Sequence, residues 1–383
     1  MGPASSLHPA NLERKWGDML PSVFMLLAVS GGTSPDVAPG LVVAWGDTGF
    51  GQTAVPEGLM AVQVDTLSDH TVARTPEGGV VAWGRNDWGQ CDLPSELHWI
   101  DADAGGAHTI LLSDAGQAVG VGWNAFGQCD APEGEVFAAV DAGYYHSVGL
   151  TVDGRVLAWG LDLDGRTEPP SINDGIDISC GANHTLLLRS DGSILAWGRN
   201  DEGQCNVPGD PGYQHISAGF YHSAATRTNE TSEVWGTNTF QVLDVPPQQP
   251  FVNIVCGIGH SAAVLPDGTV RLWGFNQFGQ TDAPAGTYAM LTAGQGHTVG
   301  IRGAPCPVAL GEPDANQNGI HDRCECLADL SGDRQVNFVD LLLVINAWGP
   351  VELGTVGDVD GDGVVQFNDL LVVLDAFSVQ CPL

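Results

Sequence analysis

Residues 80–94 read VVAWGRNDWGQCDLP: an apolar run ends in Trp-Gly, a polar turn follows, and Gly-Gln leads to a proline. The stretch recurs with a period of 38 residues. One copy holds Val121 in the tryptophan slot, still followed by Gly122, with Trp123 two places further on. Sustained self-similarity at one period indicates a repeat protein. The tryptophans on the grid are Trp45, Trp83, Trp159, Trp197, Trp235 and Trp273.

Two further residue types keep the same step, so three independent markers define the repeat. The first marker is a histidine, found at His70, His108, His146, His184, His222, His260 and, after a one-residue deletion, His297. The second marker is a turn glycine, found at Gly78, Gly116, Gly154, Gly192 and Gly268, with Glu230 replacing it once.

Each unit has the pattern of a β-hairpin. A short apolar run follows the histidine. An Asp-Gly or similar pair then makes a tight turn, where glycine adopts a positive φ with little strain, and a second apolar run ends at the tryptophan. The proline after Gly-Gln stops further ladder pairing. A unit of 38 residues fits one four-stranded propeller blade.

The two ends of the array are out of phase with each other. Gly32 stands where a histidine would precede Trp45, and Leu310 stands where a tryptophan would follow His297. The seventh unit is therefore split between the two ends, and joining its halves would leave no bare sheet edge. The sequence predicts an all-β fold over residues 41–303: a seven-bladed β-propeller closed by pairing of its N- and C-terminal strands.

The repeat pattern aGxxHsxal…dGxvxaWGxNxxGQ resembles that of the regulator of chromosome condensation family. Its short period and early proline are closest to the secreted β-lactamase-inhibitor propellers of that superfamily. The resemblance covers residues 41–303 and implies protein–protein recognition through loops on one propeller face.

The repeated histidines and tryptophans are interpreted as scaffold. We expect each histidine to satisfy backbone groups where a strand begins, and each tryptophan to pack between sheets. A histidine ring that binds metal is the alternative, but metal ligands must converge on one point. Residues that break the repeat are better binding candidates, because a scaffold requirement would recur in every unit. The aromatic pairs before two of the histidines are therefore the predicted partner-binding residues: Tyr144, Tyr145, Phe220 and Tyr221.

Two acidic loops follow the repeats, at residues 329–340 and 358–369. Each has the oxygen-rich spacing of a twelve-residue Ca²⁺ loop and precedes an apolar, helix-like run. Gly363 supplies the sharp turn in the second loop, whereas Arg334 occupies that position in the first. The predicted ligands are Asp329, Ser331, Asp333, Gln335, Asn337 and Asp340 in the first loop, and Asp358, Asp360, Asp362, Val364, Gln366 and Asp369 in the second, with Gln335 and Val364 acting through their backbone carbonyls.

Residues 327–383 resemble a dockerin module, a small α-helical domain with paired EF-hand-like loops. The resemblance implies folding on Ca²⁺ and a cohesin-like protein partner. The helix positions that read the partner are mostly apolar here, at Leu341–Val344 and Leu370–Val373, which leaves a structural Ca²⁺ module or a surface anchor as alternatives. Cys326 and Cys381 bracket the module, and a disulfide between them would tie its ends.

The linker, residues 304–326, contains PDANQNGIHDRCE, which resembles a thrombospondin type 3 Ca²⁺ repeat. Its implied ligands are Asp314, Asn316, Asn318 and Asp322, and we expect a disulfide between Cys306 and Cys324 to close the segment. The sequence does not determine the pairing of the repeat cysteines, which are Cys91, Cys129, Cys180, Cys205 and Cys256.

The N-terminus and the charge indicate an exported protein. Arg14 and Lys15 precede an apolar stretch that ends in small residues, as in a signal peptide over residues 1–30, with a linker over 31–40. That stretch is too short to span a bilayer. The formal net charge of −33 disfavours nucleic acid and anionic membranes as partners. We expect a secreted or cell-surface location and a monomeric propeller.

No catalytic motif for acyl or phosphoryl transfer or for metal-assisted hydrolysis occurs in the sequence. The favoured function is non-catalytic recognition: the propeller binds a protein or glycan ligand, and a Ca²⁺-dependent module anchors it to a scaffold or cell surface. A polysaccharide-active or other hydrolase is one alternative. It needs a carboxylate pair, to which Asp162, Asp164 or Asp201 could contribute from loops. Against a hydrolase, these residues occupy positions that we interpret as polar in every repeat. A secreted enzyme inhibitor is the other.

Overall fold

The computed structural model describes residues 37–95, 98–209, 211–229, 231–246 and 250–303, together with the two short strands β23 (Gly349–Pro350) and β24 (Val364–Val365). The chain divides into two compact units, Met1–Pro305 and Cys306–Leu383. The first unit holds the repeats, and the second holds β23 and β24, which pair in an antiparallel ladder.

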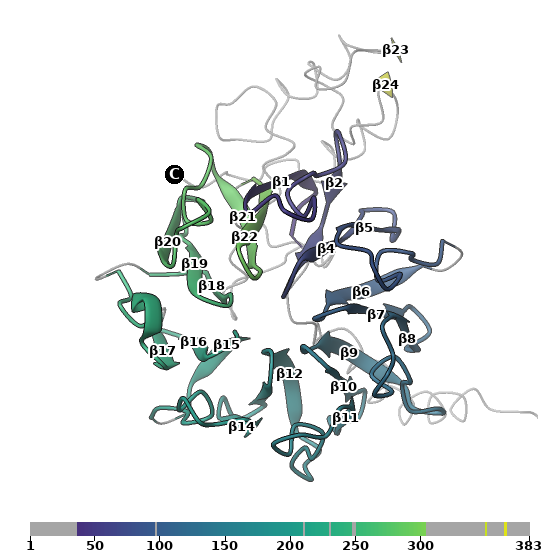
Figure 1. Cartoon of the computed structure of the whole chain (residues 1–383), viewed down its shortest axis with the longest axis vertical. Coiled ribbons are helices and arrows are strands. Elements are labelled where there is room, and N and C mark those ends of the chain that lie inside the picture. The colour runs from purple at the N-terminus through teal and green to yellow at the C-terminus, as the bar shows by residue number, and fades with distance from the viewer. Residues whose placement is uncertain are drawn as a thin grey trace, which may run out of the picture. The chain divides into compact units, whose positions relative to one another are not determined.

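Seven antiparallel sheets make up the described part of the first unit, and Figure 1 shows them arranged around one centre, as the blades of a propeller are. The first six sheets are β3 (Gln63–Asp65), β4 (His70–Arg74) and β5 (Val80–Gly84); β6 (Trp99–Ala104), β7 (His108–Ser113) and β8 (Ala118–Gly122); β9 (Phe137–Ala142), β10 (His146–Thr151) and β11 (Val156–Gly160); β12 (Gly175–Cys180), β13 (His184–Arg189) and β14 (Ile194–Gly198); β15 (Tyr213–Ala218), β16 (His222–Arg227) and β17 (Ser232–Gly236); and β18 (Asn253–Cys256), β19 (His260–Val264) and β20 (Val270–Gly274). The seventh contains β21 (Tyr288–Ala293), β22 (His297–Arg302), β1 (Gly40–Gly46) and β2 (Met60–Ala61).

The strand that begins with the histidine is almost wholly buried. It is the middle strand of the six three-stranded sheets, and in the seventh sheet it lies between β1 and β21. It connects to the tryptophan strand through the predicted tight turn. In the third sheet Gly154 has φ +80° and its N–H donates to Thr151 O at 2.9 Å. This turn fixes the register that pairs Ser147 with Trp159.

The prediction of four strands in every blade is wrong: six of the seven described sheets have three. The polar stretch after the tryptophan strand folds on itself instead of adding a strand. Gly84 leaves the strand at φ +101°, and Asn86 Oδ1 then accepts the N–H of Cys91 at 2.9 Å. Because the asparagine satisfies this backbone group locally, no neighbouring strand is needed there. Among the described residues, only the seventh sheet has a fourth strand, β2, which pairs with β1.

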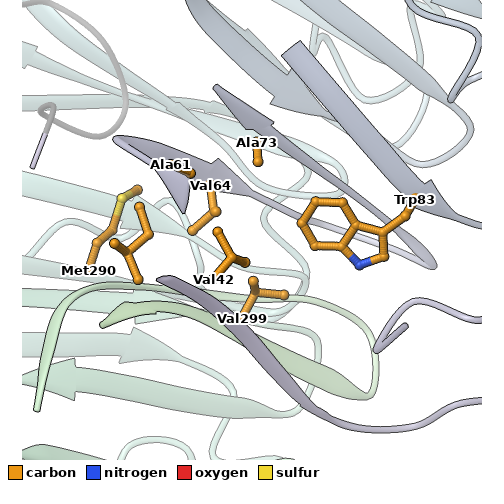
Figure 2. Packing of buried hydrophobic residues seen from close by; sticks show 8 residues of the cluster. Val42, Ala61, Val64, Ala73, Trp83, Met290 and Val299 are labelled. Atoms are coloured by element: carbon orange, nitrogen blue, oxygen red, sulfur yellow. The ribbon is translucent and has the colours of Figure 1, made fainter. Parts of the chain in front are cut away.

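Strand β1 from the start of the repeats pairs antiparallel with β22 from their end, in a register that runs from Val42↔Ile301 to Gly46↔His297. A hydrophobic cluster joins the same two regions of sequence (Figure 2). Both ends of the repeat region thus contribute to one sheet and one core. The labelled members of the cluster are Val42, Ala61, Val64, Ala73, Trp83, Met290 and Val299.

The repeat histidines link each sheet to the next, through side-chain hydroxyl groups rather than through the backbone groups that we predicted. Each Nε2 lies 2.8–3.2 Å from a hydroxyl oxygen of the following sheet. Thr109 Oγ1 donates onward to Gln90 O, so it accepts from His70, which is therefore protonated on Nε2. Burial lowers the pKa of His70 to about 4, which keeps this side chain neutral at physiological pH. The pairs are His70–Thr109, His108–Ser147, His146–Thr185, His184–Ser223, His222–Ser261, His260–Thr298 and His297–Thr71.

The repeat tryptophans lie in the cores between sheets, as predicted. The indole N–H of Trp83 also donates to Gln52 O at 2.9 Å, a residue of the preceding repeat. The equivalent bond recurs in the other repeats with a grid tryptophan. The most faithfully repeated residues therefore build the contacts between sheets, and function must be sought elsewhere in the repeat.

Candidate functional site: an aromatic face on the repeat loops

The four aromatic residues predicted to bind a partner lie together. The rings of Tyr144 and Tyr145 are 4.7 Å apart, those of Phe220 and Tyr221 are 4.4 Å apart, and those of Tyr144 and Phe220 are 6.0 Å apart. The two pairs precede β10 and β16, with a whole sheet between them. That sheet carries Ala182 at the equivalent position, where a small side chain lets the two pairs meet.

Three further aromatic residues extend this cluster toward the preceding sheets. Trp123 lies 5.2 Å from Tyr145, measured between ring centroids, and Phe126 lies 5.9 Å from it. Trp88 lies 6.0 Å from Trp123. We call this continuous row of seven rings the aromatic arc: Trp88, Trp123, Phe126, Tyr145, Tyr144, Phe220 and Tyr221.

The repeat position of Trp88 was not predicted as a binding position, although the period of 38 reveals it. An aromatic residue stands there in five repeats, and these five side chains are 43–56% exposed. In four of these repeats the buried glutamine two places further on accepts the backbone N–H of the aromatic residue, as Gln128 Oε1 does from Phe126 N at 3.0 Å, which holds the loop that carries the ring. Val242 stands in the glutamine's place in the Phe240 repeat. The five residues are Phe50, Trp88, Phe126, Phe240 and Phe278.

The same slot holds Asp164 and Glu202 in the other two repeats, which corrects our interpretation that the Asp164 slot is polar in every repeat. Arg166 replaces the glutamine beneath Asp164, and its side chain is only 2% exposed. Its guanidinium donates to Asn183 Oδ1 at 2.8 Å and pairs with Asp164 at 3.2 Å. Burial lowers the pKa of Arg166, so these oxygens hold a charge that is costly to bury.

The carboxylates proposed for a hydrolase lie in these open loops. Asp162, Asp164 and Asp201 are all exposed, and Asp201 pairs with Arg199 at 3.0 Å. Asp164 is likewise paired with an arginine, so both carboxylates are exposed to solvent and hold a cationic partner of the protein's own. The geometry of these loops gives no support to a hydrolytic role.

Buried carboxylates do lie at the centre of the sheets, around a cavity of about 60 Å³. Burial raises the pKa of Asp65 to about 6 and raises that of Asp141 well above its usual range. Both accept backbone N–H groups of the next sheet, from Ala104 at 2.9 Å and Cys180 at 2.7 Å. These bonds join the first strand of one sheet to the first strand of the next. Nowhere in the described residues do three histidine, cysteine or acidic side chains gather in a way that could hold a metal ion.

The predicted Ca²⁺ ligands and the four cysteines proposed for disulfides lie outside the described residues, apart from Val364. That residue is in β24, where it pairs with Pro350. The five cysteines of the repeats, Cys91, Cys129, Cys180, Cys205 and Cys256, are all free thiols. No helix among the described residues is long and apolar enough to cross a membrane.

Two family models match the chain. The regulator of chromosome condensation (RCC1) repeat matches residues 137–166, 176–204 and 251–280, and the dockerin type I domain matches residues 327–377. With the seven repeat sheets, these matches define the class of protein: an RCC1-like repeat propeller followed by a dockerin domain. No curated protein matches the chain in sequence.

Solved structures show the same fold for the repeats. Prp20p from Saccharomyces cerevisiae, described together with its binding to Gsp1p and histones, has a TM-score of 0.60 at 16% identity, over 73% of this chain and 94% of its own. The CRINKLY WD40 ectodomain of the Arabidopsis thaliana receptor kinase ACR4 has a TM-score of 0.54 at 23% identity, over 63% and 92%. Human WBSCR16 has a TM-score of 0.57 at 17% identity, over 70% and 100%. At these identities the likeness concerns the fold alone.

Proposed function

We propose that this chain is an exported, non-catalytic recognition protein. Its seven sheets form a closed propeller that binds a protein ligand through the aromatic arc. Its dockerin domain attaches it, in a Ca²⁺-dependent way, to a cohesin-like partner on a scaffold or cell surface.

The observation that carries the recognition role is the arc itself. Seven aromatic rings form one connected row on loops, and Trp88 and Phe126 within it are 56% and 43% exposed. Aromatic side chains dominate the binding energy of protein interfaces, because they bury a large area at a small cost in conformational entropy. Buried glutamines hold the loops that carry Trp88 and Phe126, so these two exposed rings are preorganised for binding.

Affinity capture tests this role. Full-length protein is immobilised and exposed to the extracellular fraction of the producing cells, and retained proteins are compared between wild type and the double variant Tyr145→Ala/Tyr221→Ala. Phe240→Ala/Phe278→Ala is the matched control, because it also removes two aromatic rings from repeat loops, here outside the arc. We expect a protein that wild type and control retain and the arc variant loses. If all three retain the same proteins, the arc is not the recognition site.

The anchoring role rests on the dockerin match and on the chemistry of the two loops, whose predicted ligands are all oxygen donors, as Ca²⁺ requires. Calorimetric titration of the full chain with Ca²⁺ should show binding that Asp362→Ala reduces by one site. Glu133→Ala, an exposed carboxylate of the repeats, should leave the titration unchanged. Equal Ca²⁺ uptake by wild type and Asp362→Ala would refute the assignment of that loop.

A further inference from the structure

The charges and ring contacts around the aromatic arc favour one class of ligand. We propose, on the basis of the function above, that the partner presents a basic segment: arginine or lysine side chains interleaved with apolar ones.

The loops that carry the arc and continue it to the next sheet have an excess of negative charge. Residues 85–92, 123–130, 161–168 and 199–206 contain eight acidic and three basic side chains, a net charge of −5. The three arginines are already paired within the protein: Arg85 with Asp87 at 2.6 Å, Arg166 with Asp164 at 3.2 Å and Arg199 with Asp201 at 3.0 Å. The remaining carboxylates leave a negative potential over the arc, which attracts a cationic partner.

The protein itself places guanidinium groups on aromatic rings of this face. Arg85 Cζ lies 4.7 Å from the ring centroid of Phe50, and Arg199 Cζ lies 6.0 Å from that of Tyr221. Trp88 and Phe126 occupy the same repeat slot as Phe50, and within the described residues no guanidinium lies over either ring. A partner's arginine or lysine can make there the cation–π contact that Arg85 makes with Phe50.

Carboxylates also stand directly in the aromatic slot. In one loop Phe126 reaches Tyr145 of the following sheet, at 5.9 Å between ring centroids. Two repeats later, Glu202 occupies the position of Phe126, and Tyr221 occupies the position of Tyr145. Glu202 is exposed and forms no ion pair with any described residue. Repeat symmetry therefore sets a carboxylate beside an aromatic ring, the combination that binds a charged side chain with an apolar stem.

A peptide-binding experiment on the full-length protein tests this proposal. The probes are a fluorescein-labelled peptide of four Arg-Gly-Leu repeats and a matched peptide of four Gln-Gly-Leu repeats, titrated by fluorescence anisotropy. We expect the arginine peptide to bind at least about tenfold more tightly, and to lose about tenfold in affinity between low and moderate salt, because exposed charges are screened.

Two double variants with the same change in charge locate the site. Asp164→Asn/Glu202→Gln should weaken binding of the arginine peptide about five- to tenfold, an effect of roughly 1 kcal/mol. Asparagine is chosen because Asp164 has φ +62°, which asparagine tolerates. The control, Glu57→Gln/Glu133→Gln, changes exposed carboxylates in turns after the repeat prolines and should leave affinity unchanged.

Equal affinity for the two peptides, or equal effects of the two double variants, overturns the proposal. The same holds if a natural partner found by capture, protein or glycan, is lost by Tyr145→Ala/Tyr221→Ala but unaffected by salt and by Asp164→Asn/Glu202→Gln. In that case the recognition role of the arc stands and the basic partner is wrong. Failure of the tyrosine variant to change capture refutes the recognition role itself.

Discussion

Replacing one of the repeat histidines that link neighbouring sheets should change how the stability of the propeller depends on pH. His222 is fully buried with its Nε2 2.8 Å from Ser261 Oγ, and burial lowers the pKa of His222 to about 3. In an unfolded chain the pKa of histidine is about 6.5. Because the folded-state pKa is the lower one, the stabilisation is fully present above pH 6.5 and is lost as the pH falls toward 3.

The size of the effect follows from these two pKa values. At pH 5 the unfolded side chain is about 1.5 pH units below its pKa and binds a proton, whereas folded His222 is still neutral. At about 1.4 kcal/mol per unit, this side chain alone lowers the free energy of unfolding by about 2 kcal/mol between pH 8 and pH 5. The variant His222→Gln keeps a donor near Ser261 but cannot titrate, so its deficit relative to wild type should shrink by about 2 kcal/mol at pH 5.

Urea unfolding followed by tryptophan fluorescence, at pH 8 and pH 5 in constant Ca²⁺, measures this difference. The control is Ser261→Ala, which breaks the same hydrogen bond but leaves His222 able to titrate. Its deficit relative to wild type should be similar at the two pH values. A deficit of His222→Gln that is equal at pH 8 and pH 5 would show that this histidine is not held neutral by burial.

Three other predictions concern the scaffold. Gly143→Ala should destabilise the propeller by more than about 2 kcal/mol in thermal unfolding, because its Cβ would lie 2.1 Å from His146 Cε1. The control is Gly134→Ala, where a Cβ meets nothing within 4 Å; it should cost only about 1 kcal/mol, because this residue has a positive φ. Trp159→Phe should cost about 1–2 kcal/mol, since it removes an indole hydrogen bond to a main-chain carbonyl, and an equal melting temperature would contradict that role. Arg155→Ala should leave the unfolding midpoint unchanged within error, because its ion pairs are exposed to solvent; a clear shift would show that they stabilise the fold.

The sheets could be predicted from the sequence because hairpin signals and period act locally and repeat. Asp-Gly turns set the register between His146 and Gly160, and the phase of the array predicted that β1 would pair with β22. The fourth strand was predicted wrongly because a local hydrogen bond decides whether the residues after the tryptophan strand form a turn or a strand. A length of 38 residues allows a fourth strand, but length does not show that the polar turn after Trp83 closes on itself, with Asn86 Oδ1 accepting the N–H of Cys91.

The candidate site could be predicted only in part. Breaks in the repeat identified Tyr144 and Phe220, but their contact across an intervening sheet depends on how the sheets are arranged around their common centre. Trp88 and Phe126 were missed for the opposite reason, since they conform to the repeat. Exposure distinguishes them from the scaffold aromatics, and a pattern of residue types does not report exposure when a ring sits on a loop.

The position of β22 between β1 and β21 has a mechanical consequence for a protein held by a domain that follows the repeats. Tension applied through the chain after residue 303 reaches β22 first. That strand is bonded along both edges, from Val42↔Ile301 on one side and from Met290↔Ile301 on the other, so it cannot be peeled off one ladder at a time as an edge strand can. Pulling β22 out therefore loads two rows of hydrogen bonds, so this sheet should withstand a larger force than one in which the chain left from an edge strand.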